Sequence, residues 1–212
     1  MGFGLVLLAV WQAQVGSKHP ASEPVKRRPS CPKGAGRRRL YEEVHVRAVI
    51  VYESLWGNTA AVARAIAEGF GPGAQAYATV EAGKDVLADA ELIVAGGPVF
   101  AFQLSSERTR EEIRQNPGPG APTPDLSHPS IRAWLNELPA GTAWCAAFDT
   151  QVRGPFGKGA PSIAKLLQAK GYRLLAAPEG FIVSGKQGPL RPGELERAHA
   201  WGAQLRQLIE SP

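Results

Sequence analysis

The sequence predicts an α/β domain built on a doubly wound, five-stranded parallel sheet. From residue 46 onward, short runs of β-branched and apolar residues alternate with segments of helical periodicity. The strand runs are nearly continuous in apolar residues, as expected when helices cover both faces of a sheet. Alternation of strands with helices is typical of parallel α/β architecture.

The first strand and the first helix are the clearest of these elements. Residues 46–52 (VRAVIVY) form the β-branched run that predicts the first strand. Residues 60–70 place Val62, Ile66 and Phe70 four positions apart, and so on one face of a helix.

The remaining elements repeat this alternation to the end of the chain. Further strands are expected at residues 76–80, 91–95, 142–148 and, in two pieces, 172–176 and 180–183. Further helices are expected at residues 85–90, 105–115, 130–138, 160–170 and 193–209. Gly96-Gly97-Pro98 is expected to end the third strand, and the Pro- and Gly-rich residues 116–125 are expected to form an exposed loop.

Residues 1–45 are predicted to be a disordered basic extension of a domain that spans residues 46–212. Residues 1–40 contain eight Lys and Arg against one acidic residue, a charge of +7, so the remainder carries 5 − 7 = −2. The basic charge of the chain therefore does not indicate nucleic-acid binding by the folded part. Residues 1–12 are apolar, but a membrane-spanning helix needs about 20 residues, so no stable membrane insertion is expected. A targeting or membrane-surface segment is the alternative for this extension.

Cysteine and histidine usage argues against several classes of site. The two cysteines, Cys31 in the extension and Cys145 in an apolar run, are too few for a disulfide framework, which favours a cytoplasmic protein. Cys145 is expected to be an inert core residue. The four histidines are scattered along the sequence, so neither a metal cluster nor a catalytic triad is predicted.

The connection between the first strand and the first helix carries the main functional signal. Residues 52–59 (YESLWGNT) would end at a helix N-terminus, where unpaired N–H groups and the helix dipole favour an anion such as a phosphate. Gly57 permits close approach of the backbone to a ligand. Ser54, Asn58 and Thr59 can donate side-chain hydrogen bonds. The chain lacks the Gly-x-x-x-x-Gly-Lys-Ser/Thr motif of nucleoside triphosphate P-loops.

This connection resembles the FMN-phosphate loop of the flavodoxin family, in which a Ser/Thr-x-Ser/Thr-Gly-x-Thr pattern follows the first strand. Ser54 matches the first hydroxyl, and residues 57–59 (GNT) match the second half. Leu55 and Trp56 depart from the pattern, because they replace positions that often carry hydroxyl groups. Each missing donor costs about 1 kcal/mol unless backbone N–H groups compensate. The resemblance implies a flavodoxin-like fold with strand order 2-1-3-4-5, and FMN as the cofactor.

Two further connections resemble the flavodoxin loops that hold the isoalloxazine ring. Residues 96–102 (GGPVFAF) follow the third strand and would line one face of the ring, with Phe100 and Phe102 as the stacking candidates. Residues 149–154 (DTQVRG) follow the fourth strand, and their backbone N–H groups would contact the pyrimidine side of the ring. Arg153 could neutralise negative charge on a reduced flavin. The ring-binding candidates are Pro98, Val99, Phe100, Ala101, Phe102, Asp149, Thr150, Arg153 and Gly154.

Each of these signals has a simpler structural explanation when it is taken alone. A Gly-Asn-Thr turn commonly ends a strand or caps a helix. Phe100 and Phe102 could be core aromatics, and Arg153 could be a solvated loop charge. The polar residues 105–110 are expected to start a helix, with contact to a partner or a nicotinamide phosphate as the alternative. Glu53 is expected to face solvent, because a carboxylate pointing into the loop would repel an anion.

These observations predict an FMN-binding electron-transfer protein whose partner is a redox protein or a small-molecule electron acceptor. No side chain is assigned a catalytic role, since the flavin supplies the chemistry. Two alternatives stay open. A flavin-dependent NAD(P)H:quinone-type reductase would use residues 103–128 to build a substrate pocket above the ring. A non-redox binding module of the same fold would have lost FMN, with Leu55 and Trp56 as the sign of that loss.

Overall fold

The computed structural model describes residues 46–100, 103–118, 120–155 and 157–211. The predicted N-terminal extension, residues 1–45, lies outside these ranges. The strands are β1 (Ala48–Tyr52), β2 (Ala74–Ala78), β3 (Leu92–Phe100), β4 (Gln103–Leu104), β5 (Trp144–Val152), β6 (Arg173–Leu174) and β7 (Glu179–Val183). The helices are α1 (Asn58–Phe70), α2 (Lys84–Leu87), α3 (Glu107–Gln115), α4 (Ile131–Glu137), α5 (Ala160–Ala169) and α6 (Glu194–Glu210).

The sheet has the predicted doubly wound topology. Its strands run in the order β2-β1-β3-β5-β6, with β7 also paired to β5, and all of these pairs are parallel. The short β4 pairs antiparallel with the end of β3. The predicted order 2-1-3-4-5 is therefore confirmed, with β5 as the fourth strand and the fifth divided between β6 and β7.

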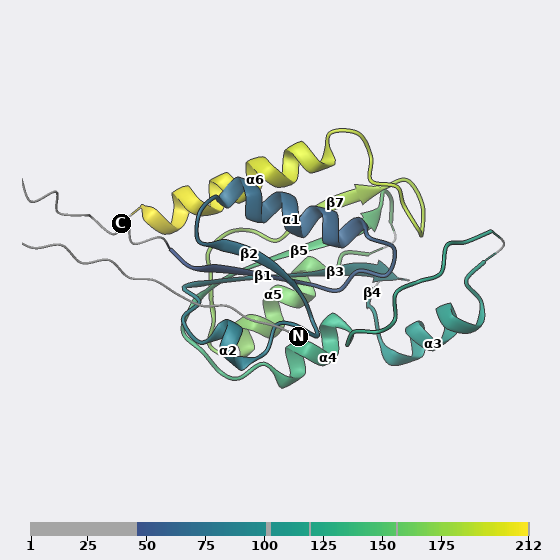
Figure 1. The fold of residues 1–212 in the computed structure, drawn as a ribbon, viewed down its shortest axis with the longest axis horizontal. Helices are drawn as coiled ribbons and strands as arrows, with labels where there is room; N and C mark the ends of the chain where they lie inside the picture. Colours follow the sequence, from purple (N-terminus) through teal and green to yellow (C-terminus); the bar gives the residue numbers. More distant parts are fainter. Residues whose placement is uncertain (1–45, 101–102, 119, 156, 212) are drawn as a thin grey trace, which may run out of the picture. The chain divides into compact units, whose positions relative to one another are not determined.

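Helices cover both faces of this sheet (Figure 1). On the face covered by α1 and α6, Ile50 of β1 packs in a buried cluster with Ile66 of α1. On the face covered by α4 and α5, Val49 and Val51 belong to a second cluster, because successive strand residues point to opposite faces. Cys145 is buried in this second cluster, which confirms its predicted place in the core, and burial raises the pKa of its thiol to about 11.

β3 continues through Gly96-Gly97-Pro98, so the prediction that these residues end the third strand was wrong. A Cβ at Gly96 would lie 2.1 Å from the nearest ring atom of Phe148, so this glycine makes room for an aromatic ring of the adjacent strand. β5 likewise runs on to Val152, and Pro98 pairs in register with Thr150. Asp149 and Thr150 therefore lie in a strand and not in a loop.

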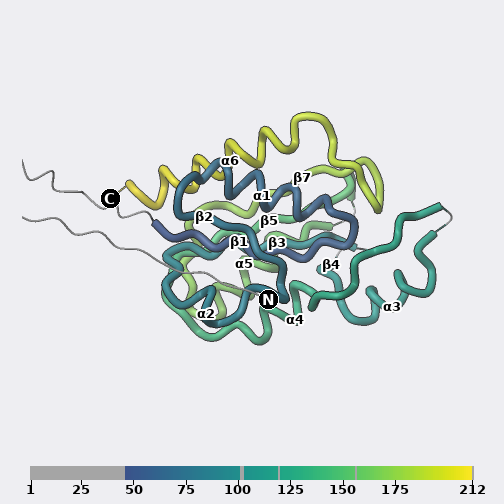
Figure 2. The backbone as a smooth tube through the Cα atoms, in the orientation of Figure 1, coloured from purple at the N-terminus to yellow at the C-terminus, as the bar shows by residue number. Residues whose placement is uncertain are grey.

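The chain between β3 and α4 makes a long excursion beyond the carboxyl end of the sheet (Figures 1 and 2). α3 lies in this excursion and begins at Ser106, whose hydroxyl accepts a hydrogen bond from the N–H of Thr109 (3.2 Å). α4 begins in the same way at Ser130. Within the described ranges, no helix has both the length and the apolar character needed to span a membrane.

Candidate functional site

The loop between β1 and α1 (residues 53–57, hereafter the first loop) presents backbone donors that nothing caps. Gly57, at the N-cap of α1, has φ 85° and ψ −15°, a left-handed conformation that favours glycine, and no side chain caps the helix. A Cβ at Gly57 would meet no atom within 4 Å, so the space in front of this residue is open. The N–H groups of Leu55 and Trp56 have no hydrogen-bond partner in the described part of the chain. The first loop thus offers donors to an anion at the start of a 13-residue helix.

The hydroxyl of Ser54 also lacks a partner. Ser54 is 6% exposed, and among the residues that the structure describes its Oγ finds no hydrogen bond. A buried polar group without a partner costs about 1–3 kcal/mol, so a ligand oxygen bound here would be stabilising. Ser54 lines a narrow cleft of about 30 Å³. This volume is about one water molecule's share of liquid, so a phosphoryl group requires the cleft to widen.

Trp56 lines the narrow cleft. Its ring packs edge-on against that of Phe100, with the centroids 6.1 Å apart. Its Nε1–H donates to the carbonyl oxygen of Pro122 (3.1 Å) in the Pro-rich segment. The indole therefore ties the first loop to that segment, while the space in front of Gly57 stays free.

Thr59 and Thr150, predicted as parts of two different loops, meet in the structure. Their Oγ atoms lie 2.8 Å apart, and both residues are buried. One hydroxyl donates to the other, which leaves one of the two protons for a further acceptor. Both residues line the narrow cleft, so this remaining proton is a candidate donor to a ligand there. The bond also joins the start of α1 to β5.

The connection after β7 (residues 184–190, hereafter the β7 loop) forms another wall of the cleft, and the sequence analysis missed it. The side-chain amide of Asn58 donates to the carbonyl oxygen of Gln187 (2.9 Å). Gly188 lies so close to Asn58 that a Cβ there would be 2.5 Å from its Nδ2. Lys186 is exposed and lines both the narrow cleft and a larger cavity beside it. The run Ser-Gly-Lys-Gln-Gly-Pro, with glycines on both sides of a cation, was the available sequence signal.

The larger cavity has a volume of about 610 Å³, within the range of about 300–1,000 Å³ that is typical of ligand pockets. It adjoins the narrow cleft, because four residues line both spaces. The ends of β3 and β5 contribute one part of its wall, and α3 contributes another. The lining residues are Val99, Phe100, Thr109, Glu112, Ile113, Asn116, Gln151, Val152 and Lys186.

Apart from Asp149 and Thr150, the predicted ring-binding residues fall into three groups. Residues 98–100 line the narrow cleft, and Val99 and Phe100 also line the larger cavity. Ala101 and Phe102 lie outside the described residues. Residues 153–154, the predicted Arg153 and Gly154, are exposed and belong to the lining of neither space. Gln151 and Val152, which belong to the predicted segment 149–154 but were not among the individual candidates, line the larger cavity.

Asp149 anchors the segment that follows β5. Its side chain is 1% exposed, and Oδ2 accepts from the N–H groups of Gly159 and Ala160, each at 2.8 Å, at the start of α5. Oδ1 has no partner in the part of the chain that the structure describes. Burial raises the pKa of Asp149 to about 6, although the two N–H donors favour the charged form and oppose this rise. Asp149 lines neither cavity, so it acts on the site only by fixing the backbone between β5 and α5.

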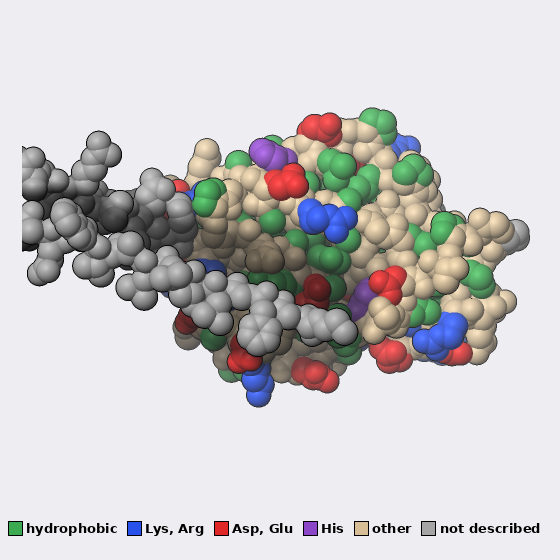
Figure 3. All heavy atoms as spheres, in the orientation of Figure 1, with side chains coloured by type: hydrophobic (Ala, Val, Ile, Leu, Met, Phe, Trp, Pro, Cys, Tyr) green, Lys and Arg blue, Asp and Glu red, His purple; other side chains and the backbone are tan. Residues whose placement is uncertain are grey.

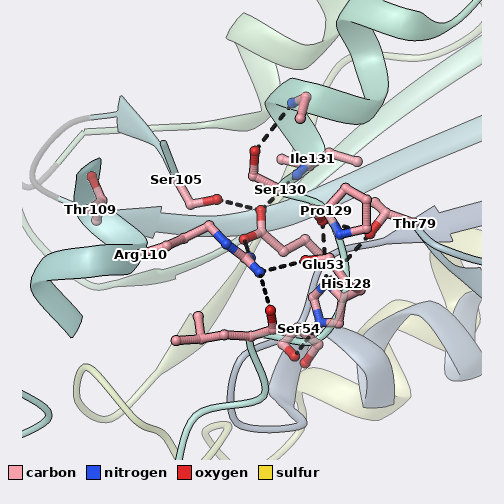
Figure 4. A network of polar contacts seen from close by, with 12 residues as sticks. Glu53, Ser54, Thr79, Ser105, Thr109, Arg110, His128, Pro129, Ser130 and Ile131 are labelled. Atoms are coloured by element: carbon pink, nitrogen blue, oxygen red, sulfur yellow. Dashed lines mark hydrogen bonds and ion pairs between the residues drawn. The ribbon is translucent and has the colours of Figure 1, made fainter. Parts of the chain in front are cut away.

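Glu53 is fully buried, so the prediction that it faces solvent was wrong. Figure 4 shows its carboxylate among three donors. The guanidinium of Arg110 lies 2.6 Å from Oε1, the hydroxyl of Ser105 donates to Oε2, and the N–H of Ile131 also donates to Oε2 (2.8 Å). All three partners donate to the carboxylate, and Arg110 forms a buried ion pair with it.

The alternative considered for residues 105–110, contact with a partner or a nicotinamide phosphate, does not hold for two of them. Ser105 is fully buried and Arg110 is 3% exposed, and both are committed to Glu53. The second terminal nitrogen of Arg110 donates to the carbonyl oxygens of Leu126 (3.1 Å) and His128. No local pattern could have revealed this network, since Glu53 and Arg110 lie 57 residues apart.

Comparison with solved structures finds the same architecture in flavodoxins. The structure is similar to a flavodoxin from the domain Archaea, with a TM-score of 0.54 and 18% identity over 77% of this chain and 99% of that one. It is similar to flavodoxin 2 from Bacillus cereus (TM-score 0.53, 14% identity, 76% and 98% covered). A third similar structure is a WrbA-like flavodoxin protein from Agrobacterium tumefaciens (TM-score 0.50, 20% identity, 77% and 96% covered). No protein-family model and no curated protein matches the sequence. The chain has the flavodoxin-like fold, as the sequence predicted.

Proposed function

We propose that this chain binds FMN and acts as an electron-transfer protein of the flavodoxin type. The observation that carries the proposal is the first loop, where the partnerless hydroxyl of Ser54 and the unpaired N–H groups of Leu55 and Trp56 adjoin the start of α1. Neutral donors at the positive end of a helix dipole suit a phosphate. The sequence of the loop and the flavodoxin-like fold support FMN as the molecule that carries it.

The flavin ring would occupy the larger cavity, with Phe100 on the β3 side and Gln151 and Val152 on the β5 side. Bound FMN supplies the redox chemistry by accepting electrons and passing them on. The residues of the chain hold and tune the cofactor. Lys186 lines both spaces, so its charge would favour the phosphate and any negative charge on the ring.

Binding requires the narrow cleft to widen, and we place this movement in the β7 loop. The hydroxyl pair of Thr59 and Thr150 holds the wall between α1 and β5, and Glu53 holds the first loop through buried contacts. The β7 loop is joined to α1 by the bond between Asn58 and Gln187, and several of its side chains are exposed. Outward movement of this loop would admit the phosphate. Closure of the loop would then bring Lys186 back beside the phosphate.

The test is reconstitution of the full chain with FMN, followed by removal of free flavin and an absorption spectrum. The wild type should keep a flavin band near about 450 nm. Gly57→Val places a β-branched side chain in the open space and in an unfavourable φ, and Thr59→Val removes one hydroxyl of the buried pair. Each variant should bind FMN at least about tenfold more weakly. Unchanged FMN affinity in both variants refutes the phosphate assignment, and a wild type without flavin leaves only the non-redox binding module.

The reach of the larger cavity favours a second candidate, a flavin-dependent NAD(P)H:quinone-type reductase. Thr109, Glu112 and Ile113 of α3 line the cavity together with the two ring-holding strands, so the space extends into the excursion between β3 and α4. A carrier needs no such wall, because its ring edge stays open to a partner. Turnover of NADPH with a quinone well above a free-FMN control would favour the reductase. Turnover equal to that control would favour the carrier.

The proposed partner is a redox protein or a small-molecule electron acceptor, and not a nucleic acid. Residues 41–212 carry a net charge of 5 − 7 = −2. On the face seen in Figure 3, acidic and basic side chains are mixed and do not gather into one basic patch. Nucleic-acid binding relies on such a patch. A cytoplasmic location remains part of the proposal, and the free, buried thiol of Cys145 is compatible with it.

A further inference from the structure

A chain of buried polar contacts joins the first loop to the excursion between β3 and α4 (Figure 4). Glu53, the residue before Ser54, pairs with Arg110. Arg110 in turn donates to the carbonyl oxygen of His128, and Nε2 of His128 lies 3.2 Å from the carbonyl oxygen of Ser54. A carbonyl oxygen only accepts, so this contact is a hydrogen bond in the tautomer that carries a proton on Nε2; Nδ1 lies at the same distance, 3.2 Å, from the carbonyl oxygen of Pro129. Glu53, Arg110 and His128 are each 5% exposed or less.

These contacts orient two peptide groups of the first loop. The carbonyl of Ser54 accepts from His128, and the carbonyl of Leu55 accepts from the N–H of Asp125 (2.8 Å). In a trans peptide group the C=O and the following N–H point in opposite directions. With both carbonyls turned toward residues 125–128, the N–H groups of Leu55 and Trp56 point away from that segment. They are the same N–H groups that lack partners, at the two positions where this loop has no hydroxyl side chain.

The network also has an electrostatic consequence for an anion in the narrow cleft. Consecutive Cα atoms are about 3.8 Å apart, so with the lengths of both side chains added the carboxylate of Glu53 lies within about 15 Å of a phosphate held by Ser54. At an effective dielectric constant of about 20, repulsion over this distance would weaken binding of a phosphate dianion by more than about tenfold. Arg110 is in contact with the carboxylate and offsets most of this repulsion.

We infer that Arg110 is a positioning residue for the FMN phosphate, which it does not itself contact. It acts through two partners. It neutralises the charge of Glu53, and it holds the carbonyl of His128 so that the imidazole of His128 stays in contact with the carbonyl of Ser54. This inference rests on the proposed function. A network that only stabilised the fold would change the binding of every flavin alike. A positioning role makes the effect specific for the phosphate.

The test compares FMN with riboflavin, which has the same ring but no phosphate, by quenching of flavin fluorescence on the full chain. Arg110→Met leaves Glu53 unpaired and should weaken FMN binding at least about tenfold more than riboflavin binding, a difference of about 1.4 kcal/mol. Arg110→Lys keeps the charge and should keep the ratio of the two dissociation constants. Glu53→Gln leaves Arg110 uncompensated and should shift the ratio further toward FMN. The double variant Glu53→Gln/Arg110→Met removes both charges and should return the ratio to within about threefold of the wild type.

Circular dichroism establishes which variants fold. If Arg110→Met does not fold, Glu53→Gln and the double variant carry the test, because neither leaves a buried carboxylate unpaired. A ratio that stays at the wild-type value in Glu53→Gln, or in a folded Arg110→Met variant, overturns the inference and leaves the proposed function standing. A wild type that binds neither flavin, or binds both equally, overturns the proposed function and the inference together.

Discussion

Asp149 should make the free energy of unfolding of the domain depend on pH. Its contribution should fall as the pH rises, whereas the contribution of a carboxylate in a salt bridge rises. Its pKa is raised from 3.8 to about 6, chiefly by burial. Because the pKa is higher in the folded state than in the unfolded chain, the folded state binds the proton more tightly. The stabilisation from this group is therefore complete below about pH 4 and is lost as the pH rises through about 6. A shift of about two units at about 1.36 kcal/mol each gives about 3 kcal/mol, with little screening, since Asp149 is 1% exposed.

The assay is urea unfolding between pH 4 and pH 8 for the wild type and for Asp149→Asn. The amide oxygen of the variant can still accept from the N–H groups of Gly159 and Ala160, but the side chain no longer ionises. Between pH 4 and pH 7 the wild type should lose about 2.4 kcal/mol more of its free energy of unfolding than the variant loses. Asp125→Asn is the matched control, because hydrogen bonds from Ser127 lower the pKa of Asp125 and give its contribution the opposite sign. A difference between wild type and Asp149→Asn that is constant across this pH range would refute the reasoning.

Two further predictions concern the β7 loop. Lys186→Gln should weaken FMN binding about tenfold and reduce the salt dependence of binding, because the side chain lines both cavities. The free energy of unfolding should not change, because the side chain is exposed. Fluorescence titration at low and high salt measures the effect on binding, and equal salt dependence in the wild type and the variant would count against the prediction. The backbone amides of residues 184–188 and of Leu190 should exchange more slowly with solvent deuterium once FMN is bound, because the loop must open to admit the phosphate and close over it. Unchanged exchange in this loop would place the opening of the cleft elsewhere.

The succession of strands and helices could be predicted because the relevant signals are local, whereas the strand order 2-1-3-4-5 was implied by the resemblance to flavodoxins. Apolar runs and helical periodicity identify each element, and the alternation of elements then fixes a parallel sheet. The errors arose where a local signal had a tertiary cause. Gly96 reads as a strand end, but it accommodates the ring of Phe148 in a neighbouring strand. Its true role depends on a contact that no window of the sequence contains.

The same distinction explains which part of the site was predicted. The first loop is contiguous in sequence, and its glycine, hydroxyl and helix start could be read together. The wall formed by Gln187 was missed because its contact with Asn58 spans 129 residues. Glu53 was predicted to face solvent because a carboxylate beside an anion site is unfavourable when no cation compensates its charge. Its compensating partner, Arg110, comes from an excursion whose path the sequence does not specify.

If the donors at the start of α1 hold a phosphate, the dissociation constants of FMN and riboflavin must differ, and their ratio is the decisive measurement. Isothermal titration of the unmodified full chain with FMN and with riboflavin gives both constants under one set of conditions. FMN should bind at least about a hundredfold more tightly, about 2.7 kcal/mol, since only FMN reaches Ser54 and the open space at Gly57. Equal affinity for the two flavins, or no binding of either, would contradict it.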